Sequence, residues 1–336
     1  MSRRALVVDG TGSIGLEGLP SLQPGPGEVV VRPAYCGVCG TDLELLHGKI
    51  DAAFVRYPLV LGHEWAGTVE AVGEGVTGIR VGMRCVAEGI IPCGHCPACS
   101  TGATNVCTTY DEIGFTRAGA ASDQVVVPAR VVHALGDDVP LLDAALTEPS
   151  AVVLTGLEKA HLRPGMRVLV VGDGTIALLS VLLALLSGPA EIVVAGRRPE
   201  QEALAIGLGA DSFTTGPPPS GFDFAIEAAG VTEATLTAIR SLRRGGTALL
   251  LGLPPAGTTL TLPADLLVND DLSLVASFGY TTAGWGQVVA LLNAGSVRPG
   301  RLVTHKFALA DFDRAFAELA TPSGTRGKVM LEVAGG

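Results

Sequence analysis

Two short motifs near the start of the chain hold sulfur, imidazole and carboxylate side chains. The first reads CGVCGTD over residues 36–42, and the second reads GHEWAG over residues 62–67. Such a mixed set of ligands suits a zinc site that keeps one position open for a substrate. Both motifs follow β-rich segments, and together they predict a catalytic metal site.

Both motifs also allow plainer interpretations. Cys36 and Cys39 could join Cys93 and Cys96 in a two-knuckle zinc ribbon, but the later cysteine cluster already has four thiols of its own. His63 taken alone could be a buried histidine with satisfied hydrogen bonds. From the residues alone that alternative stays open.

A second cluster of cysteines has the spacing C-x2-C-x2-C-x7-C, with glycine and proline between the thiols. Four thiolates on one short loop complete a tetrahedral sphere, which is the arrangement of structural zinc. An iron–sulfur cluster is the alternative, but bacterial ferredoxin spacing closes with three residues and a proline rather than seven. His95 lies inside the loop, and we expect it not to bind. The predicted ligands of structural zinc are Cys93, Cys96, Cys99 and Cys107.

A dinucleotide-binding fingerprint, G-x-G-x-x-A over residues 172–177, follows the strand-like Val168–Val171 and precedes a long apolar stretch. In this setting the first glycine permits a tight turn, and the second lets the backbone approach the cofactor pyrophosphate. The amides that begin the helix can hold the pyrophosphate charge. The predicted residues are Gly172, Gly174, Thr175 and Ile176.

The next predicted strand, Ile192–Ala195, bears on the choice of coenzyme. An acid after it would accept a hydrogen bond from the ribose 2′-hydroxyl of NAD. Here Gly196, Arg197 and Arg198 follow, so a small residue leaves space and two guanidinium groups can neutralise a 2′-phosphate. The sequence therefore favours NADP, with NAD possible, although the two arginines could simply begin an exposed helix.

The pattern of predicted strands and helices changes near residue 150. Before it, short β-rich segments are separated by glycine and proline. After it, apolar strands alternate with helical stretches, which indicates a parallel, doubly wound sheet. β character returns near the end of the chain. We therefore predict an α/β protein with a β-rich domain over 1–147, to which 290–336 returns, and a dinucleotide-binding domain over 148–289.

Charge and composition exclude several classes of function. The 336 residues suit two domains, and the net charge of −10 disfavours a nucleic-acid or membrane-surface partner. The longest apolar run, over residues 176–186, is too short to span a membrane. Met1 is not followed by a secretory signal pattern, so we expect a cytoplasmic location, where seven cysteines favour metal binding over disulfides. We expect a small-molecule partner.

Taken together, these motifs make the chain resemble the zinc-dependent medium-chain dehydrogenase/reductase superfamily, in particular its sorbitol, threonine and glucose dehydrogenase branch. The resemblance covers nearly the whole chain and includes Glu148-Pro149, residues 222–230 and the closing GKV of 327–329. It implies a GroES-like catalytic domain around a Rossmann domain, with the active site in the cleft. It implies hydride transfer between a secondary alcohol, such as a polyol, sugar or cyclitol, and the nicotinamide. A homodimer or homotetramer is expected by the same analogy.

The resemblance also implies metal ligands. Cys39 and His63 correspond to the fixed ligands of the catalytic zinc, whereas Cys36 is not expected to bind. Glu64 and Glu148 correspond to carboxylates that bind directly, through water or in alternation.

Other roles follow from the resemblance in the same way. Asp42 corresponds to the acid that orients the zinc-bound histidine, and Thr41 to the hydroxyl that relays the substrate proton. Lys328 lies where the family places a basic residue near the pyrophosphate, although an ordinary exposed lysine is the alternative. Glu44 stands where many relatives have a relay histidine, and it could act as the terminal base or contact a substrate hydroxyl or amine. Gly40 replaces an arginine that some alcohol dehydrogenases use on the pyrophosphate.

Two other functions fit parts of the pattern. A zinc-free quinone or enoyl reductase on the same scaffold would need neither Cys39 nor His63. A catalytically idle nucleotide-sensing protein would have no reason to keep both ligands together with the carboxylates and the hydroxyl. Metal analysis separates these alternatives, because the dehydrogenase alone predicts two zinc ions per chain.

Overall fold

The computed structural model describes residues 2–321 and 324–334, which divide into two compact units. The first unit contains Met1–Glu148, Thr281–Ser323 and Lys328–Gly336, and the second contains Pro149–Tyr280 and Gly324–Gly327. We placed the return to the first domain at 290, whereas here it comes at 281. The reason is α9 (Thr282–Asn293), most of which we placed in the second domain but which contacts α3 (Leu141–Ala144) of the first unit.

The first unit is built on a seven-stranded sheet in the order β10-β6-β5-β3-β18-β17, with β9 also pairing with β3. All of these pairs are antiparallel except β17 with β18. The strands are β3 (Glu28–Val38), β5 (Glu64–Val72), β6 (Arg84–Ala87), β9 (Val125–Pro128), β10 (Val132–Ala134), β17 (Val303–Ala308) and β18 (Lys328–Glu332). β3 connects the two parts of the sheet, because it pairs with three other strands.

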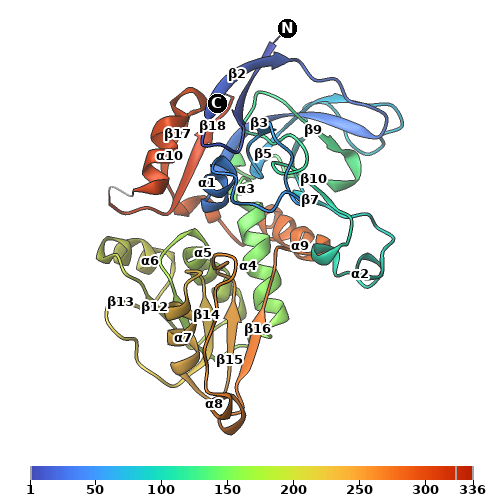
Figure 1. Ribbon diagram of the computed structural model, residues 1–336. Helices are drawn as coiled ribbons and strands as arrows, with labels where there is room; N and C mark the ends of the chain where they lie inside the picture. The colour runs from blue at the N-terminus through green and yellow to red at the C-terminus, as the bar shows by residue number, and fades with distance from the viewer. Residues whose placement is uncertain (1, 322–323, 335–336) are drawn as a thin grey trace. The chain divides into compact units, whose positions relative to one another are not determined.

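Smaller elements complete the first unit. A three-stranded sheet has the order β2-β1-β4, and β7 pairs with β8. Of these strands, Figure 1 labels β2, near the N-terminus, and β7. These strands are β1 (Ser2–Val8), β2 (Ile14–Pro20), β4 (Leu59–Val60), β7 (Ile90–Ile91) and β8 (Asp111–Glu112). The helices, besides α3 and α9, are α1 (Gly40–Leu46), α2 (Pro97–Ser100) and α10 (Phe312–Ala320). Buried apolar side chains from both sheets and from α1 and α10 form one core, which holds the strand ends described below in place.

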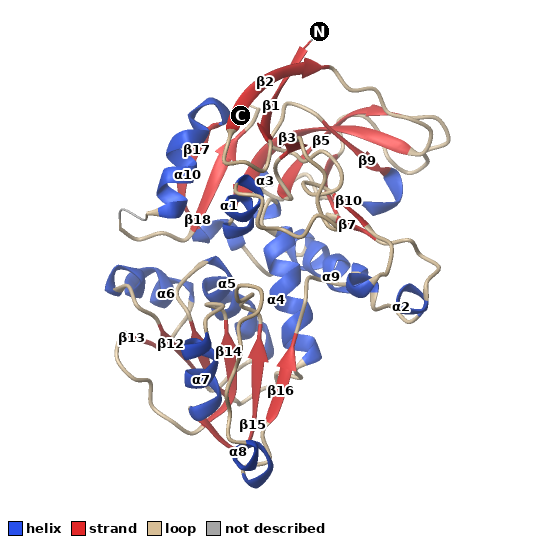
Figure 2. Ribbon diagram, viewed as in Figure 1, coloured by secondary structure: helices blue, strands red, loops and turns tan. Residues whose placement is uncertain are grey.

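The second unit is a six-stranded parallel sheet in the order β13-β12-β11-β14-β15-β16. Counted within the unit, this order is 3-2-1-4-5-6, that of a doubly wound dinucleotide-binding fold. Figure 2 shows its strands side by side among helices. The strands are β11 (Arg167–Val171), β12 (Glu191–Ala195), β13 (Ser212–Thr214), β14 (Phe222–Glu227), β15 (Leu242–Leu250) and β16 (Ser273–Ala276). The helices are α4 (Thr147–Lys159), which crosses the boundary in sequence, α5 (Thr175–Ala184), α6 (Glu202–Leu208), α7 (Thr232–Arg240) and α8 (Ala264–Asn269).

The central strands of this sheet are largely apolar because helices cover both faces of such sheets. β11 has the burial pattern of a strand enclosed on both faces, with four of its five residues buried. α5 is buried along most of its length, as expected for a helix that is apolar on all sides. These features confirm the predicted fold class of an α/β protein with a doubly wound sheet.

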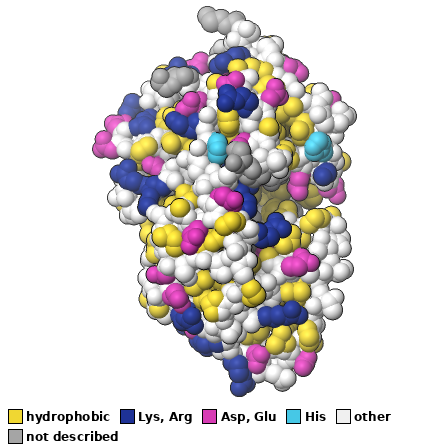
Figure 3. Space-filling view, turned by 90° about the vertical axis from the view of Figure 1, so that its left-hand side faces the viewer, with side chains coloured by type: hydrophobic (Ala, Val, Ile, Leu, Met, Phe, Trp, Pro, Cys, Tyr) yellow, Lys and Arg dark blue, Asp and Glu magenta, His cyan; other side chains and the backbone are white. Residues whose placement is uncertain are grey.

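Two properties of the described residues bear on which partners the protein binds. Among the described residues, no helix combines the length and the apolar character needed to cross a bilayer. On the face drawn in Figure 3, acidic, basic and hydrophobic side chains of the described residues are interspersed.

Candidate active site

Three strand ends of the first unit bring the predicted ligand residues together. β3 ends directly before Cys39, and β5 begins at Glu64, directly after His63. Because β3 and β5 run antiparallel, with Gly37 opposite Glu64, the end of one lies beside the start of the other. β18 pairs with β3 on its other side and begins at Lys328. Residues distant in sequence therefore meet at one edge of the sheet.

Cys39, His63 and Glu64 form the ligand cluster. Each offers one ligand atom, and these atoms lie within 4.8 Å of one another. The Sγ of Cys39 lies 3.1 Å from Nε2 of His63. Sulfur, imidazole nitrogen and carboxylate oxygen are the donors that bind zinc in proteins, so the residues present fit a catalytic zinc ion.

Asp42 lies behind His63, on the first turn of α1. Its Oδ2 accepts a hydrogen bond from the backbone N–H of Cys39 at 2.9 Å, and its Oδ1 lies 3.6 Å from Nδ1 of His63. Burial is the largest influence on the pKa of His63 and lowers it, but the charges of Cys39, Asp42 and Glu64 raise that pKa well above its usual value. With Nε2 facing Cys39 and Nδ1 facing Asp42, the acid is placed to orient the imidazole, as the resemblance implies.

Cys36 and Glu148 lie outside the ligand cluster. Cys36 is 1% exposed, and burial raises the pKa of its thiol well above the usual value, so the thiol stays neutral. Burial, with the charge of Glu64 as the next cause, raises the pKa of Glu148 to about 8. Among the described residues, the cluster of ligand atoms includes Glu64 and not Glu148. Whether Glu148 binds zinc in alternation stays a prediction.

Lys328 lies in the interior, in an ion pair between its Nζ and Oε2 of Glu64, and the two side chains are 1% and 4% exposed. Both side chains pack against Gly37. A Cβ at this position would clash with the Glu64 carboxylate and would lie 2.7 Å from Cε of Lys328. The alternative of an ordinary exposed lysine is therefore wrong. A contact of Lys328 with the cofactor pyrophosphate stays a prediction.

Thr41 and Glu44 lie three residues apart on α1, and both side chains are partly exposed. Residues at this spacing share one face of a helix. Neither side chain belongs to the ligand cluster. The proton relay through Thr41 and the substrate or base role of Glu44 remain predictions.

The four cysteines of the second cluster also meet, with their sulfur atoms within 4.8 Å of one another. Cys93 Sγ lies 3.9 Å from that of Cys99, and Cys96 Sγ lies 3.9 Å from that of Cys107. Hydrogen bonds from backbone N–H groups lower the pKa of Cys93 to about 5 and that of Cys96 to about 7. Four sulfurs at this spacing, two of them favoured as thiolates, fit the predicted structural zinc. His95 Nδ1 lies 3.0 Å from the carbonyl oxygen of Cys93, apart from the sulfur cluster.

In the second unit, the start of α5 has the features of a pyrophosphate site. Gly172 adopts φ +128°, and a Cβ there would lie 3.1 Å from the backbone of Ala228. A Cβ on Gly174 would meet nothing within 4 Å, so the space in front of the turn is open. No side chain caps α5, which leaves the first-turn amides, those of Thr175 and Ile176 included, available to an anion. The turn therefore fits a dinucleotide.

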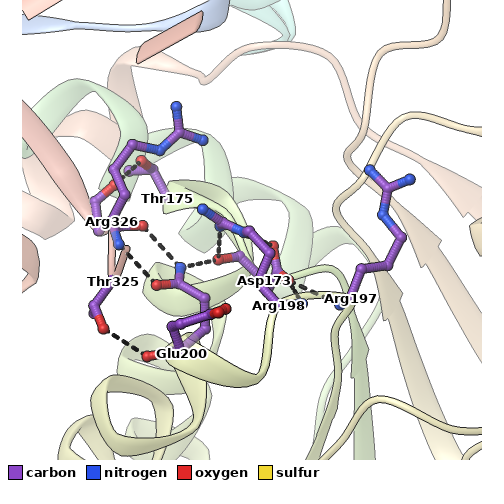
Figure 4. A network of polar contacts seen from close by, with 9 residues as sticks. Asp173, Thr175, Arg197, Arg198, Glu200, Thr325 and Arg326 are labelled. Carbon is purple, nitrogen blue, oxygen red and sulfur yellow. Dashed lines mark hydrogen bonds and ion pairs between the residues drawn. The ribbon is translucent and has the colours of Figure 1, made fainter. Parts of the chain in front are cut away.

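The loop after β12 differs in detail from the prediction. A Cβ on Gly196 would lie 2.5 Å from the Phe213 ring and 2.8 Å from Cβ of Asp173, so packing requires glycine here, whereas we assigned Gly196 only to the space for a 2′-phosphate. Nη2 of Arg198 donates to Oδ1 of Asp173 at 2.9 Å. Arg197 is exposed, and its side chain extends away from this network (Figure 4). The two arginines therefore occupy different environments.

Comparisons with known proteins agree with this architecture. Residues 25–137 match the alcohol dehydrogenase GroES-like domain, and residues 175–294 match the zinc-binding dehydrogenase family. The sorbitol dehydrogenase of Halalkalibacterium halodurans is 30% identical over 340 residues, covering 96% of each chain. The chain belongs to the zinc-dependent medium-chain dehydrogenase/reductase superfamily. The resemblance of the sequence motifs is thereby confirmed.

Two solved structures of similar proteins differ in their coenzyme. A Sinorhizobium meliloti protein described as a zinc-binding dehydrogenase and bound to NADP has a TM-score of 0.92 and 28% identity, covering 99% of this chain and 100% of that one. An Escherichia coli alcohol dehydrogenase complexed with NADH has a TM-score of 0.91 and 26% identity, with the same coverage. Proteins with this fold thus bind either NADP or NADH, and the coenzyme preference must depend on individual residues.

Two residues of this medium-chain dehydrogenase were not predicted. Phe115 packs on His63 with ring centroids 5.2 Å apart, and no signal in the sequence indicates this contact because it depends on how the loop after β8 folds. Asp173, between the two glycines of the fingerprint, holds Arg198. An acid at this position with an arginine 25 residues later is a visible signal that we did not use.

Proposed function

We propose that this dehydrogenase transfers a hydride between a secondary alcohol, namely a polyol, sugar or cyclitol, and NADP(H), with zinc bound by Cys39, His63 and Glu64. The observation that carries the proposal is the cluster of sulfur, nitrogen and oxygen ligand atoms at three converging strand ends. The sorbitol dehydrogenase relative supports a polyhydroxylated alcohol as substrate.

When bound, zinc would supply a Lewis acid that makes the substrate hydroxyl more acidic, and NADP⁺ would supply the hydride acceptor. Asp42, whose Oδ1 lies 3.6 Å from Nδ1 of His63, is placed to orient the His63 ring. Thr41 accepts the proton of the substrate hydroxyl and passes it outward, and Glu44 on the same helix face binds a substrate hydroxyl or takes the relayed proton. Proton and hydride thus leave the substrate by separate routes.

The coenzyme and the assembly are part of the same proposal. The arginine pair after β12 and the absence of an acid among residues 196–198 support NADP over NAD. The dehydrogenase is proposed to form a homodimer or homotetramer. Its cytoplasmic location stays a prediction.

Metal analysis tests the proposal against a zinc-free reductase and against a nucleotide-sensing protein. We expect two zinc ions per chain in the wild type, and one in Cys39→Ser, which loses alcohol oxidation while keeping the four-cysteine site. The lobe cysteine Cys107→Ser is the complementary control, expected to keep the zinc at Cys39. An active wild type that holds no metal at Cys39 and His63 after zinc loading would contradict the proposal.

The substrate class needs a separate screen. Sugars, polyols, aminocyclitols and threonine are each offered with NADP⁺ and NAD⁺, and we expect turnover of a polyhydroxylated secondary alcohol with NADP⁺. If Glu44→Gln changes neither the pH profile nor the order of preferred substrates, the role given to Glu44 is wrong.

A further inference from the structure

The two arginines after β12 make different contacts. Arg198 lies against the glycine-rich turn before α5, where its side chain is 25% exposed and that of Asp173 is 14% exposed. Its Nε and Nη2 donate to Oδ1 of Asp173 at 3.2 and 2.9 Å, and Nη2 also donates to the Asp173 carbonyl oxygen at 3.0 Å. Nη1 of Arg198 is buried and has no hydrogen-bond partner. The guanidinium is therefore turned inward, onto the turn.

The Asp173 carboxylate fixes the backbone of the same loop. Its Oδ2 accepts the backbone N–H groups of Arg197 at 2.8 Å and of Arg198 at 2.9 Å. Gln201, which is fully buried, adds a hydrogen bond from Nε2 to the Asp173 carbonyl oxygen at 2.5 Å. The same Nε2 donates to the carbonyl oxygen of Arg326 at 2.8 Å, so the closing segment of the chain joins the network (Figure 4).

The side chain of Arg197 makes no such contacts within the described residues. Within the described residues its side chain makes no hydrogen bond or ion pair, and Figure 4 shows it directed away from Asp173. Only its backbone is held, by the Asp173 carboxylate. A guanidinium that is exposed, unpaired and anchored at its Cα can meet an anion without first breaking an ion pair, which Arg198 cannot do.

We propose that Arg197 alone reads the 2′-phosphate of NADP, and that Arg198 is a positioning residue that cancels the charge of Asp173 and thereby keeps the site receptive to an anion. This inference rests on the proposed preference for NADP. It assigns the specificity to a pair of residues with unequal roles and gives Asp173 a part in coenzyme choice.

The electrostatic reason is local. Burial alone would raise the pKa of Asp173, but hydrogen bonds from Arg198 and from the two backbone amides lower it, so the carboxylate is ionised at neutral pH. Asp173 belongs to the turn after β11, but its carboxylate contacts the backbone of the loop after β12. An ionised acid beside that loop would repel a 2′-phosphate and would accept a hydrogen bond from a 2′-hydroxyl, which favours NAD. With Arg198 in place the acid is paired, and its effect on the coenzyme is cancelled. Without Arg198 the acid would be exposed to the coenzyme.

The test measures dissociation constants of NADP⁺ and NAD⁺ by calorimetry on the zinc-replete protein. Arg197→Ala should weaken NADP⁺ binding by about tenfold or more, the loss of one charge-assisted contact, and leave NAD⁺ binding unchanged. Arg198→Ala should also weaken NADP⁺ binding, because it uncovers Asp173. Exposed Arg244→Ala, on β15, is the matched control and should change neither constant.

The double variant Asp173→Asn with Arg198→Ala distinguishes positioning from direct contact. We expect it to regain NADP⁺ affinity to within about threefold of the wild type, because the uncovered charge is gone. A double variant as weak as Arg198→Ala would overturn the inference, as would Arg197→Ala with unchanged NADP⁺ affinity. NAD⁺ binding in each variant reports that the nucleotide site is still folded.

Failure of the proposed function would look different. A wild type that binds NAD⁺ as tightly as NADP⁺ overturns the proposed coenzyme preference, and the inference with it. A wild type that binds neither overturns the proposed function itself. Only a wild type that prefers NADP⁺ can show the variant pattern described above.

Discussion

Lys328 is a buried cation in contact with a candidate metal ligand. Burial alone would lower the pKa of its ammonium group, but the charges of Glu64 and Cys39 raise it, so the group stays charged. A buried ion pair adds little net stability, yet removing one partner leaves the other charge unpaired in the interior. Lys328 therefore has a larger effect on stability than an ordinary lysine.

Replacing this cation should be costly. We expect Lys328→Met to lower the free energy of unfolding by about 3 kcal/mol or more, because Glu64 loses its counter-charge. Lys306→Met is the matched control: Lys306 lies 3.3 Å from Glu332, but the side chains are 47% and 39% exposed, so less than about 1 kcal/mol is expected. Urea unfolding of both variants after removal of the metal makes the comparison, because a zinc ion on Glu64 would itself supply a counter-charge. Equal losses of unfolding free energy in the two variants would show that the buried ion pair stabilises the fold no more than the exposed one.

At the residue scale, the sequence predicted which candidate ligand residues, Cys39, His63 and Glu64, the structure brings together, but not their surroundings. Cys39 and His63 could be chosen because sulfur and imidazole stand in short, recognisable motifs. The position of Lys328 could not, since its burial depends on the pairing of β18 with β3, almost 300 residues away in the chain. The same holds for Arg198, whose partner Asp173 belongs to another turn.

Among the elements, the four-cysteine loop is short and carries little regular structure besides α2. Its conformation should depend on metal binding, since thiolate ligands supply folding free energy when they bind zinc. We expect Cys107→Ser to lose one zinc per chain and to lower the thermal midpoint by several degrees. His95→Ala should keep both metals, because its ring lies on the Cys93 carbonyl oxygen. Zinc analysis and thermal unfolding of the two variants test this, and loss of zinc in His95→Ala would make the histidine a ligand.

β6 contains the remaining cysteine, Cys85, which is fully buried. Burial raises the pKa of its thiol to about 12. A group whose folded pKa is raised stabilises the protein below its unfolded pKa, about 8.5 here, and this contribution is lost as the pH rises toward 12. Between pH 7.5 and 10 the wild type should therefore lose about 2 kcal/mol more than Cys85→Ala. Urea unfolding at both pH values tests the difference, and identical pH slopes would contradict it.

The elements themselves could be predicted unevenly. β11 and β12 were readable as uninterrupted apolar runs, and α5 as a long apolar stretch after a glycine turn. β4, β7 and β8 have two residues each, too few for any period to show. The sequence analysis predicted no helix at α9, and the membership of α9 in the first unit is a tertiary property, set by its contact with α3.

At the scale of the whole molecule, assembly is the open property, and the second unit offers a surface for it. β16 is an edge strand, so one side of its backbone has no neighbouring strand within the described sheet. Large apolar side chains nearby in sequence are exposed: Leu253 at 76%, Val268 at 80% and Phe278 at 53%. Exposed apolar side chains and an unpaired strand edge are both features of interfaces between copies.

If copies of the chain associate through this part of the second unit, charge placed there should separate them. We expect the wild type to have the mass of a dimer or tetramer by light scattering, and Leu253→Lys with Val268→Lys to shift it to a smaller species, because two lysines from each copy would be desolvated against each other. Val81→Lys is the control, since Val81 is 61% exposed but belongs to the first unit. A monomeric wild type would contradict the assembly, and an assembly unchanged by the double variant would place its interface elsewhere.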